Sequence, residues 1–573
     1  MTSTEYSQIR RELEQMRQQP GETGRKSAVF DFGLFILLYF FALVLVATAL
    51  LAAGVSLGRY TALYAIPLAW LGLAWLRKAP GYALMISALG LLFLAAASLL
   101  VSRFIAPDGC DKVNTYLLAR GWNPFEQTAA AFASSASDLP YGAGWLASQA
   151  DTRPGASLII GAGFYALTGN IACGKAFNIA GMAAAVCVAG PLIRDAFKLS
   201  GFTAFTAALL AVVNPVTLGQ ALTYEGDGFM YQTLTVAAAA LAYMAYKPEG
   251  RFAGMAKSAA FAGVCLAVNI KASALPFCAA LCLLCYIARV IGIARSGAPR
   301  KTRTKRQLCL LLYFAAMLAA ALCALGAATY VTNFLRYGDP FYGMFAAASM
   351  NTDLETLSVI GGLPLAAQVF VSLFSPVSAG PLSEIALKIP FTVTASEFSL
   401  ASPGAVVGGW GVMFSGIFSL SVLVILWSLA VADKRRSRRG WLILLLLLAV
   451  FVPAFFVPYL YSARNYLPLF WLPAAALLCL FSAAEDTRLA PPGKGRMVLR
   501  RLLGAALCLL LIVNCVTGYN SLVMQARETD TNAVGTVYTN ALPTALADRG
   551  VINNDSLPIL SRCATAIAKE EPR

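Results

Sequence analysis

The chain has 573 residues, of which 59% are hydrophobic and only 13% are charged. A soluble protein cannot bury that much apolar surface, and apolar runs long enough to cross about 30 Å of hydrocarbon recur along the sequence, so we predict an all-α, polytopic membrane protein. The net charge of +16 does not indicate a nucleic-acid partner, because the basic residues concentrate in short loops, as they do in the cytoplasmic loops of membrane proteins.

The sequence contains no histidine, and its thirteen cysteines show no metal-ligand spacing. These features exclude a histidine base, a His–Cys pair and a histidine-containing metal site. A general base in this chain is therefore a carboxylate, unless a lysine, tyrosine or cysteine takes that role.

The N-terminal residues 1–28 are polar and basic and are predicted to form a cytoplasmic segment that includes a short amphipathic helix. No cleavable signal peptide is evident, and the first apolar run is long enough to stay in the membrane as an anchor. The next predicted spans lie at about 29–55, 60–76 and 81–103. The basic pairs at 25–26 and 77–78 mark the cytoplasmic side, which places the following stretch, 104–153, outside.

The stretch 104–153 is the first long polar interval in the chain, and its internal charge is mostly acidic. Asp108 and Asp111 lie just past a predicted span, close to the level of the lipid headgroups. Helices parallel to the membrane are expected in this outer loop, for instance around 113–120 and 127–135. We predict that the loop forms half of an active site at the outer surface.

Two apolar segments, 154–168 and 171–193, precede the basic residue Arg194. Positive-inside counting places Arg194 in the cytoplasm, which requires an odd number of crossings. One of the two segments is therefore predicted to re-enter the membrane or to lie in its interface, and the sequence leaves open which one.

The remaining apolar runs bring the prediction to about thirteen transmembrane helices in a module covering 29–525. The later spans are predicted at about 201–222, 229–246, 261–280, 308–334, 404–431, 441–459, 466–483 and 499–523, with one more helix after 280. A second outer loop, 336–401, and a polar tail, 526–573, are predicted outside. The N-terminus is then cytoplasmic and the C-terminus is outside.

The short turn at 223–228 places Glu225 and Asp227 one residue apart between two predicted spans. The flanking glycines expose the carboxylate oxygens at a tight hairpin, on the same side of the membrane as the first outer loop. The turn is therefore a candidate for the second half of the site. Alternatively, it is a polar turn in which Asp227 caps the next helix.

Several cations are candidates for binding a phosphate at the outer surface. Lys271 lies in an apolar stretch, which is costly unless the lysine pairs with another group; the alternative is that it snorkels from a helix end. Arg464 lies between two predicted spans, and a guanidinium suits bidentate binding of phosphate; the alternative is an interfacial anchor beside neighbouring tyrosines. Arg153 and Arg336 are further cations on the outer side.

Five stretches resemble a superfamily of polytopic, GT-C-type glycosyltransferases that use lipid-linked sugars, such as protein O-mannosyltransferases, aminoarabinose transferases and oligosaccharyltransferase catalytic subunits. The stretches are APDGCDKVNTYLLARGWNPF, DTRPGASLIIGAGFYALTGN, GFTAFTAALLAVVNPVTLGQALTYEGDGFMYQTL, NFLRYGDPFYGMF and SARNYLPLFWLP. They cover roughly residues 81–480, and their order and shared outer location carry the resemblance. The chain departs from the pattern in having two additional spans at the start and no adjacent acidic pair at Asp108 and Asp111.

The resemblance implies a GT-C-like fold and a plasma-membrane enzyme that transfers a sugar, with inversion, from a polyprenyl-phosphate donor to an acceptor hydroxyl outside. The acceptor would be an envelope glycan, a lipid or a protein. It implies Asp111 as the carboxylate base, with Asp108 as second choice. The residues implied to orient the acceptor, or a divalent cation such as Mg²⁺ or Mn²⁺, are Glu225, Asp227 and Tyr224. Those implied to bind the donor phosphate are Arg153, Lys271, Arg464 and Arg336.

A transporter or lipid flippase is the alternative prediction, because the sequence NIKASALP interrupts an apolar segment, and broken helices are typical of transporters. The absence of a detectable internal repeat argues against it. A third possibility is an assembly subunit without chemistry, whose outer carboxylates would lie scattered.

Overall fold

The structure is a computed structural model, which describes residues 27–104, 110–135, 153–344, 359–360, 363–378, 384–400, 407–430, 447–455, 460–485 and 494–532. Within these ranges the regular elements are helices, apart from an isolated bridge between Ser378 and Val407. The all-α prediction is therefore confirmed for the described part. Most of the predicted N-terminal segment and of the C-terminal tail lies outside the described residues.

Seven helical stretches of the described part are long and apolar enough to cross a membrane, by length and composition. They are Ala28–Ala52 (α2), Pro80–Val101 (α4), Ile171–Phe197 (η1 and α9), Ala253–Ile270 (α13), Ala274–Ala294 (α14), Arg300–Leu325 (α15 and η2) and Met497–Arg527. Shorter apolar helices include Thr61–Arg77 (α3), Ala156–Thr168 (α8), Gly201–Val212 (α10) and Phe414–Ala430 (α20). These helices fit an integral membrane protein, but the predicted number of about thirteen spans is not confirmed.

Helix α2 begins after Ser27, whose side chain caps it, and packs against α3, α4 and α9. Its Asp31 is fully buried and forms an ion pair with Arg77 at the end of α3. The Tyr82 hydroxyl, at the start of α4, donates to the same carboxylate at 2.7 Å. The buried acid is thus neutralised, and it ties the first three helices together.

The structure answers the question left open for 154–168 and 171–193. Helix α8 has 13 residues, which span only about 20 Å and are too few to cross the hydrocarbon. The stretch Ile171–Phe197 has 27 residues and is long enough. Gly169, with φ of +68°, makes the left-handed turn between them.

The predicted span at 201–222 is wrong, because the helix breaks. Helix α10 ends at Val212, and a five-residue helix, α11 (Pro215–Gly219), follows. Pro215 cannot continue α10 and disfavours helical backbone at Asn214, whose side chain instead caps α11. The chain then turns into α12 (Asp227–Tyr246).

Two further spans are not continuous α-helices. The interruption that NIKASALP predicts within 261–280 is confirmed: α13 ends at Ile270 and α14 begins at Ala274, with Lys271 in extended conformation between them. In 308–334, α15 (Arg300–Ala319) passes into the π-helices η2 (Ala320–Leu325) and η3 (Ala327–Val331) before α16 (Thr332–Tyr337).

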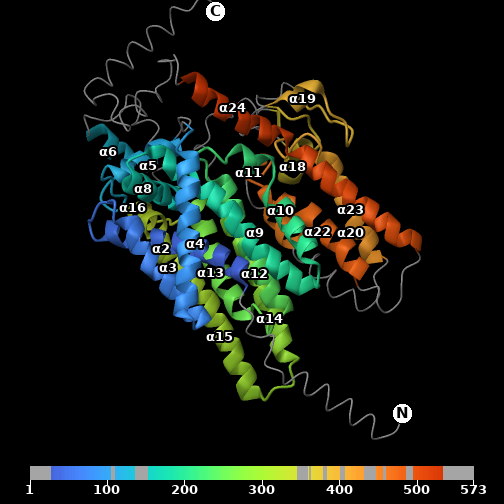
Figure 1. Ribbon diagram of the computed structural model, residues 1–573, viewed down its shortest axis with the longest axis horizontal. Helices are drawn as coiled ribbons and strands as arrows, with labels where there is room; N and C mark the ends of the chain where they lie inside the picture. Colours follow the sequence, from blue (N-terminus) through green and yellow to red (C-terminus); the bar gives the residue numbers. More distant parts are fainter. Residues whose placement is uncertain are drawn as a thin grey trace, which may run out of the picture.

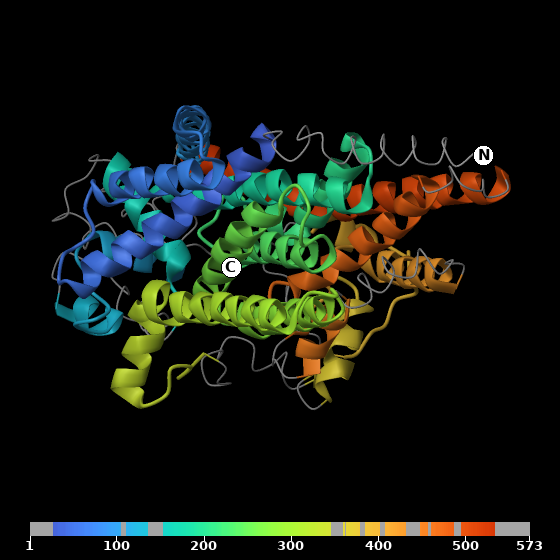
Figure 2. The same cartoon turned by 90° about the horizontal axis from the view of Figure 1, so that it is seen from below.

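The helices form two groups on opposite sides of a central set. Figure 2 shows α2–α4, in blue, and the orange to red helices near the C-terminal end on either side of the green α12 and α13. That last group contains α20, α22 (Trp471–Glu485) and α23 (Lys494–Asn514), and α22 also packs on α10. At the top of Figure 1 lie α5 (Cys110–Ala119), α6 (Ala129–Ser135), α8, α19 (Ala395–Ser399) and α24 (Val516–Asn532). Helices are therefore found where the first outer loop was predicted to carry them.

Candidate active site

The centre of the candidate site is Asp227, the first residue of α12. Its side chain is buried, and one carboxylate oxygen forms an ion pair with the Lys271 ammonium. The other oxygen pairs with Nε of Arg464 at 3.1 Å and accepts from Nε2 of Gln220 at 3.1 Å. Three stretches far apart in the sequence therefore meet at one carboxylate.

Lys271 lies at the C-cap of α13, at the outer end of the helix in the predicted topology. Besides Asp227, its Nζ contacts Oδ1 of Asn465, 2.7 Å away. Of the two predicted alternatives for this lysine, the structure shows a paired cation. Arg464 is 40% exposed, whereas Asp227 is buried, so the cluster opens to its surroundings at the guanidinium.

Gln220 was missed in the sequence analysis, although it connects both acids of the turn. Its Nε2 donates to Glu225 at 2.6 Å and to Asp227 at 3.1 Å, while its Oε1 accepts from the backbone N–H of Gly228 at 2.7 Å. Because the Gly228 N–H must point at an oxygen, the orientation of the amide is fixed, and its NH₂ group faces the carboxylates. A glutamine at the end of an apolar run is the signal that was available.

Asn178 on α9 is the second residue that was missed. It is fully buried, and its Nδ2 lies 2.9 Å from the carbonyl oxygen of Gln220, 3.1 Å from that of Thr223 and 3.2 Å from that of Glu225. The side chain therefore fixes the backbone of the acidic turn onto a helix that is long enough to cross the membrane.

The side chain of Tyr224 anchors the acidic turn to η1 and α8. Its hydroxyl donates to the Ile171 carbonyl, and its ring lies so close to Gly161 and Gly174 that a Cβ at either position would meet it at 2.9 Å or less. The structure therefore places the hydroxyl among backbone atoms of η1 and α8, and not beside Asp227.

Asp111, in the first turn of α5, belongs to the same cluster. Burial raises its pKa, the charges of Asp227 and Glu225 raise it further, and Arg464 and Arg153 oppose them, so that the pKa rises to about 6 from an ordinary 3.8. Helix α5 can pack closely against α8 because residue 161 of α8 is a glycine; a Cβ there would lie 3.1 Å from the side chain of Thr115 on α5. The first outer loop and the acidic turn therefore place their carboxylates within electrostatic reach of each other.

The other predicted site residues lie as follows. Asp108 lies outside the described residues. Arg153 is exposed, acts on Asp111 through its charge, and accepts a hydrogen bond from Thr329 at its carbonyl. Arg336, on α16, donates to the Pro124 carbonyl at 2.7 Å, so its guanidinium contacts the first outer loop rather than Asp227.

A divalent cation was a further expectation. Within the residues that the structure describes, no three Cys, Asp or Glu side chains are grouped so that they could hold a metal ion. Both oxygens of Asp227 are already occupied by Lys271, Arg464 and Gln220. The carboxylates that remain as oxygen ligands are those of Asp111 and Glu225.

Comparison with known proteins gives little beyond this geometry. No protein-family model matches the chain, and no curated protein matches it. Among solved structures, one match is the apo form of the Archaeoglobus fulgidus oligosaccharyltransferase, with 16% identity and a TM-score of 0.35 over 75% of this chain and 56% of that chain. The chain therefore spans little more than half the length of that enzyme, and a TM-score of 0.35 does not establish a shared fold.

Proposed function

We propose that this protein is a membrane glycosyltransferase that moves a sugar from a polyprenyl-phosphate donor to an acceptor hydroxyl at the outer face of the membrane, with inversion. The observation that supports this is the meeting of Asp111, Glu225 and Asp227 with the cations Lys271 and Arg464. Sugar transfer from a phosphate needs a base for the incoming hydroxyl and positive charge for the departing phosphate, and the cluster offers both.

Asp111 is the base in this proposal, with Asp108 as the second choice. As the acceptor oxygen attacks the anomeric carbon, its proton passes to the Asp111 carboxylate. A pKa of about 6 suits this step, because the group is ionised at neutral pH and is still more basic than an ordinary aspartate. Attack from the face opposite the phosphate inverts the configuration at the anomeric carbon in one displacement.

Lys271 and Arg464 receive the leaving group. The bond between the anomeric carbon and the phosphate oxygen breaks, and its electron pair stays on the polyprenyl phosphate. Asp227 holds both cations in position before the donor arrives, so that little reorganisation is needed during the reaction. Arg153 adds positive charge, and Glu225 orients the acceptor. Arg336 acts less directly, through its contact with the first outer loop.

A divalent cation, in this proposal, would be held by Asp111 and Glu225. Mg²⁺ uses one or two protein carboxylates and fills its other positions with water and substrate phosphate, so the two acids are a sufficient set. When bound, such an ion would supply further positive charge beside the phosphate. The protein would supply the two acids and, through Gln220, the orientation of Glu225.

The transporter alternative loses its main support in this geometry. Helix α13 has 18 residues, equivalent to about 27 Å, so the interruption at Lys271 falls at the end of a helix long enough to cross the membrane. Transporters place such breaks near the bilayer midplane.

Sugar transfer is tested with the purified full-length protein in liposomes, supplied with a panel of radiolabelled polyprenyl-phosphate sugars and an envelope extract as acceptor. We expect label to move from donor to acceptor, and Asp111→Asn to lower the rate by about 10²–10⁴-fold. Glu126→Gln is the matched control, since Glu126 lies in the same loop and accepts from Asn123 instead.

Binding of the donor phosphate is measured separately with polyprenyl phosphate, the product common to every sugar in the panel. Asp111→Asn should keep this binding, whereas Arg464→Gln should weaken it. No transfer with any donor, together with no binding of polyprenyl phosphate, would remove the proposal, as would full activity of Asp111→Asn.

A further inference from the structure

The segment 384–400, in the second outer loop, has an inverted distribution of polarity. Five of its large apolar side chains are between 44% and 74% exposed: Ile385, Leu387, Ile389, Phe391 and Phe398. Of its three charged residues, Glu384 at the start is exposed, whereas the side chains of Lys388 and Glu397 are buried against each other. A loop surrounded by water is expected to show the opposite pattern.

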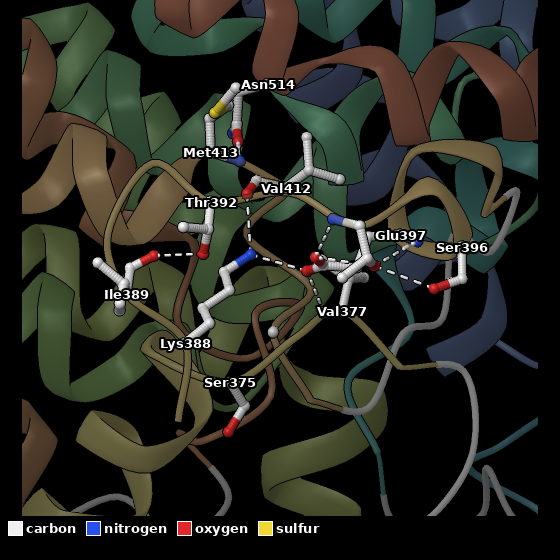
Figure 3. Close-up of polar contacts among 12 residues, drawn as sticks. Ser375, Val377, Lys388, Ile389, Thr392, Ser396, Glu397, Val412, Met413 and Asn514 are labelled. Carbon is white, nitrogen blue, oxygen red and sulfur yellow. Dashed lines mark hydrogen bonds and ion pairs between the residues drawn. The ribbon is translucent and has the colours of Figure 1, made fainter. Parts of the chain in front are cut away.

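Lys388 and Glu397 pair with each other on the inner side of the segment, where both also form hydrogen bonds with backbone groups (Figure 3). Nζ of Lys388 donates to Glu397 at 2.7 Å and to the Val412 carbonyl at 2.9 Å. Glu397 also accepts from the backbone N–H groups of Val377 at 2.9 Å and Thr394 at 3.0 Å. The two charges of the pair are thus satisfied inside the protein and need no contact with water.

The segment lies at the beginning of α20. The Val412 carbonyl that accepts from Lys388 is two residues before Phe414, the first residue of α20. The ring of Phe391 fills the space above Gly416, where a Cβ would lie 2.3 Å from it. Phe391 takes a left-handed φ of +70° to reach this position, a conformation that a bulky residue adopts only under constraint.

The helices near the segment also expose apolar side chains, as a surface in contact with lipid does. Helix α20, directly below the segment in the predicted topology, exposes Leu423 and Leu426, and the neighbouring α23 exposes Leu509 and Ile512. In that topology α20 enters the membrane from the outer side. The apolar face of the segment therefore lies where the outer leaflet meets water.

We propose that 384–400 is a membrane-contacting element whose Leu387 and Ile389 enter the outer leaflet beside α20, while the Lys388–Glu397 pair holds its polar side inward. A lipid surface fits better than a protein partner, because the segment lies at the start of α20, which exposes apolar side chains of its own, and because it carries no exposed charge for a partner to pair with, apart from Glu384 at its edge. The inference does not depend on sugar transfer.

Photo-crosslinking tests this element in the full-length protein, reconstituted into phosphatidylcholine liposomes. Benzoylphenylalanine is placed at Ile389, and in a second variant at Leu387, and the irradiated protein is digested and analysed by mass spectrometry. Trp75 on α3, at 78% exposure, is the matched position on an apolar helix face. Glu384, in the same segment, is the matched position facing water.

We expect lipid adducts at Ile389 and Leu387 in a yield comparable to that at Trp75 and several-fold above that at Glu384. Cross-links to a second copy of the chain, or to another protein in native membranes, would overturn the inference in favour of a protein interface. A lipid yield no higher than at Glu384 would place the segment in water and would also overturn it.

Discussion

Lys271, the C-cap of α13, forms an ion pair with Asp227, the first residue of α12. The pair joins two helices whose contact is among the most extensive in the molecule. It also sets the distance between the acidic turn and the segment that carries Arg464, because Lys271 contacts Asn465 as well. The same contact therefore contributes to stability and to the arrangement of the proposed site.

Removing both partners of this pair should destabilise the protein by less than the sum of the two single removals. Lys271→Met leaves Asp227 with Arg464 and Gln220, and Asp227→Asn leaves two cations without their acid, so we expect each to cost about 2 kcal/mol. The double variant should cost less than the sum of the two, as measured by thermal unfolding in detergent. Lys257→Met, at an exposed position of α13, should be close to neutral. Additive losses in the double variant would mean that the pair does not interact.

The rate of transfer should depend on the ionisation of Asp111. Its pKa is raised to about 6, and the base must be ionised, so activity should rise with pH, reach a plateau above neutrality, and be about tenfold below the plateau at pH 5. Glu225→Gln removes a negative charge that raises this pKa, so the midpoint should move to lower pH. A midpoint near the ordinary value of 3.8, or one that Glu225→Gln leaves unchanged, would contradict the assignment.

Replacing Gln220 should change the stability of the protein and, where the new side chain is acidic, the pKa of Asp111. Gln220→Met removes the donor to Glu225 and Asp227 and the acceptor for Gly228, which should cost about 1–3 kcal/mol without adding charge. Gln220→Glu keeps the shape but adds a third acid to the turn. It should therefore raise the pH midpoint of activity, because nearby negative charge disfavours ionisation of Asp111. Equal midpoints in the two variants would show that Gln220 acts through shape alone.

The charged members of the cluster could be predicted from the sequence because charges are rare in this chain and costly inside a membrane protein. A lysine within an apolar stretch has to find a partner, which singled out Lys271, and the isolated acidic turn singled out Glu225 and Asp227. Gln220 and Asn178 could not be found in this way. A neutral amide in an apolar run costs less and gives no periodic signal, and its role arises only when α9 meets the turn that follows α11.

Hydropathy predicted where apolar helices occur better than where they stop. The run 201–222 is mostly apolar, so hydropathy predicts one span there, although the Asn214–Pro215 step breaks it. The break at Lys271, by contrast, is visible in the sequence, because NIKASALP interrupts the apolar segment. Both breaks lie beside the acidic turn or its partner cation, so an average over many residues reveals the irregular backbone that shapes the site only in part.

Gly518 should be essential for the contact between α24 and α11. A Cβ at Gly518 would lie 2.4 Å from the Pro215 carbonyl oxygen and 2.9 Å from its Cα, neither of which can rotate away. Gly518→Ala should therefore separate the helices, weaken the 2.9 Å bond from Gln525 to the Gly219 carbonyl, and cost about 1–3 kcal/mol. Because Gly219 precedes Gln220, activity should fall as well. Gly495→Ala is the control, since a Cβ there meets nothing within 4 Å.

The buried Glu397 should make the segment 384–400 sensitive to acid. Burial raises its pKa, but the hydrogen bonds from Lys388, Val377 and Thr394 outweigh burial and hold the pKa below its ordinary value of 4.5. The carboxylate therefore stabilises the fold at any pH above 4.5, and this stabilisation is lost as the pH falls through the lowered pKa.

Glu397→Gln should remove this stabilisation, at a cost of about 3 kcal/mol at neutral pH, because Lys388 then lies buried without an acid. The Val377 and Thr394 amides donate to Glu397, so hydrogen exchange at these two positions, corrected for the intrinsic effect of pH, reports the change directly. Exchange should accelerate in the variant at neutral pH, but not in the exposed control Ser396→Ala, and unchanged protection would show that the backbone of the segment does not depend on the pair.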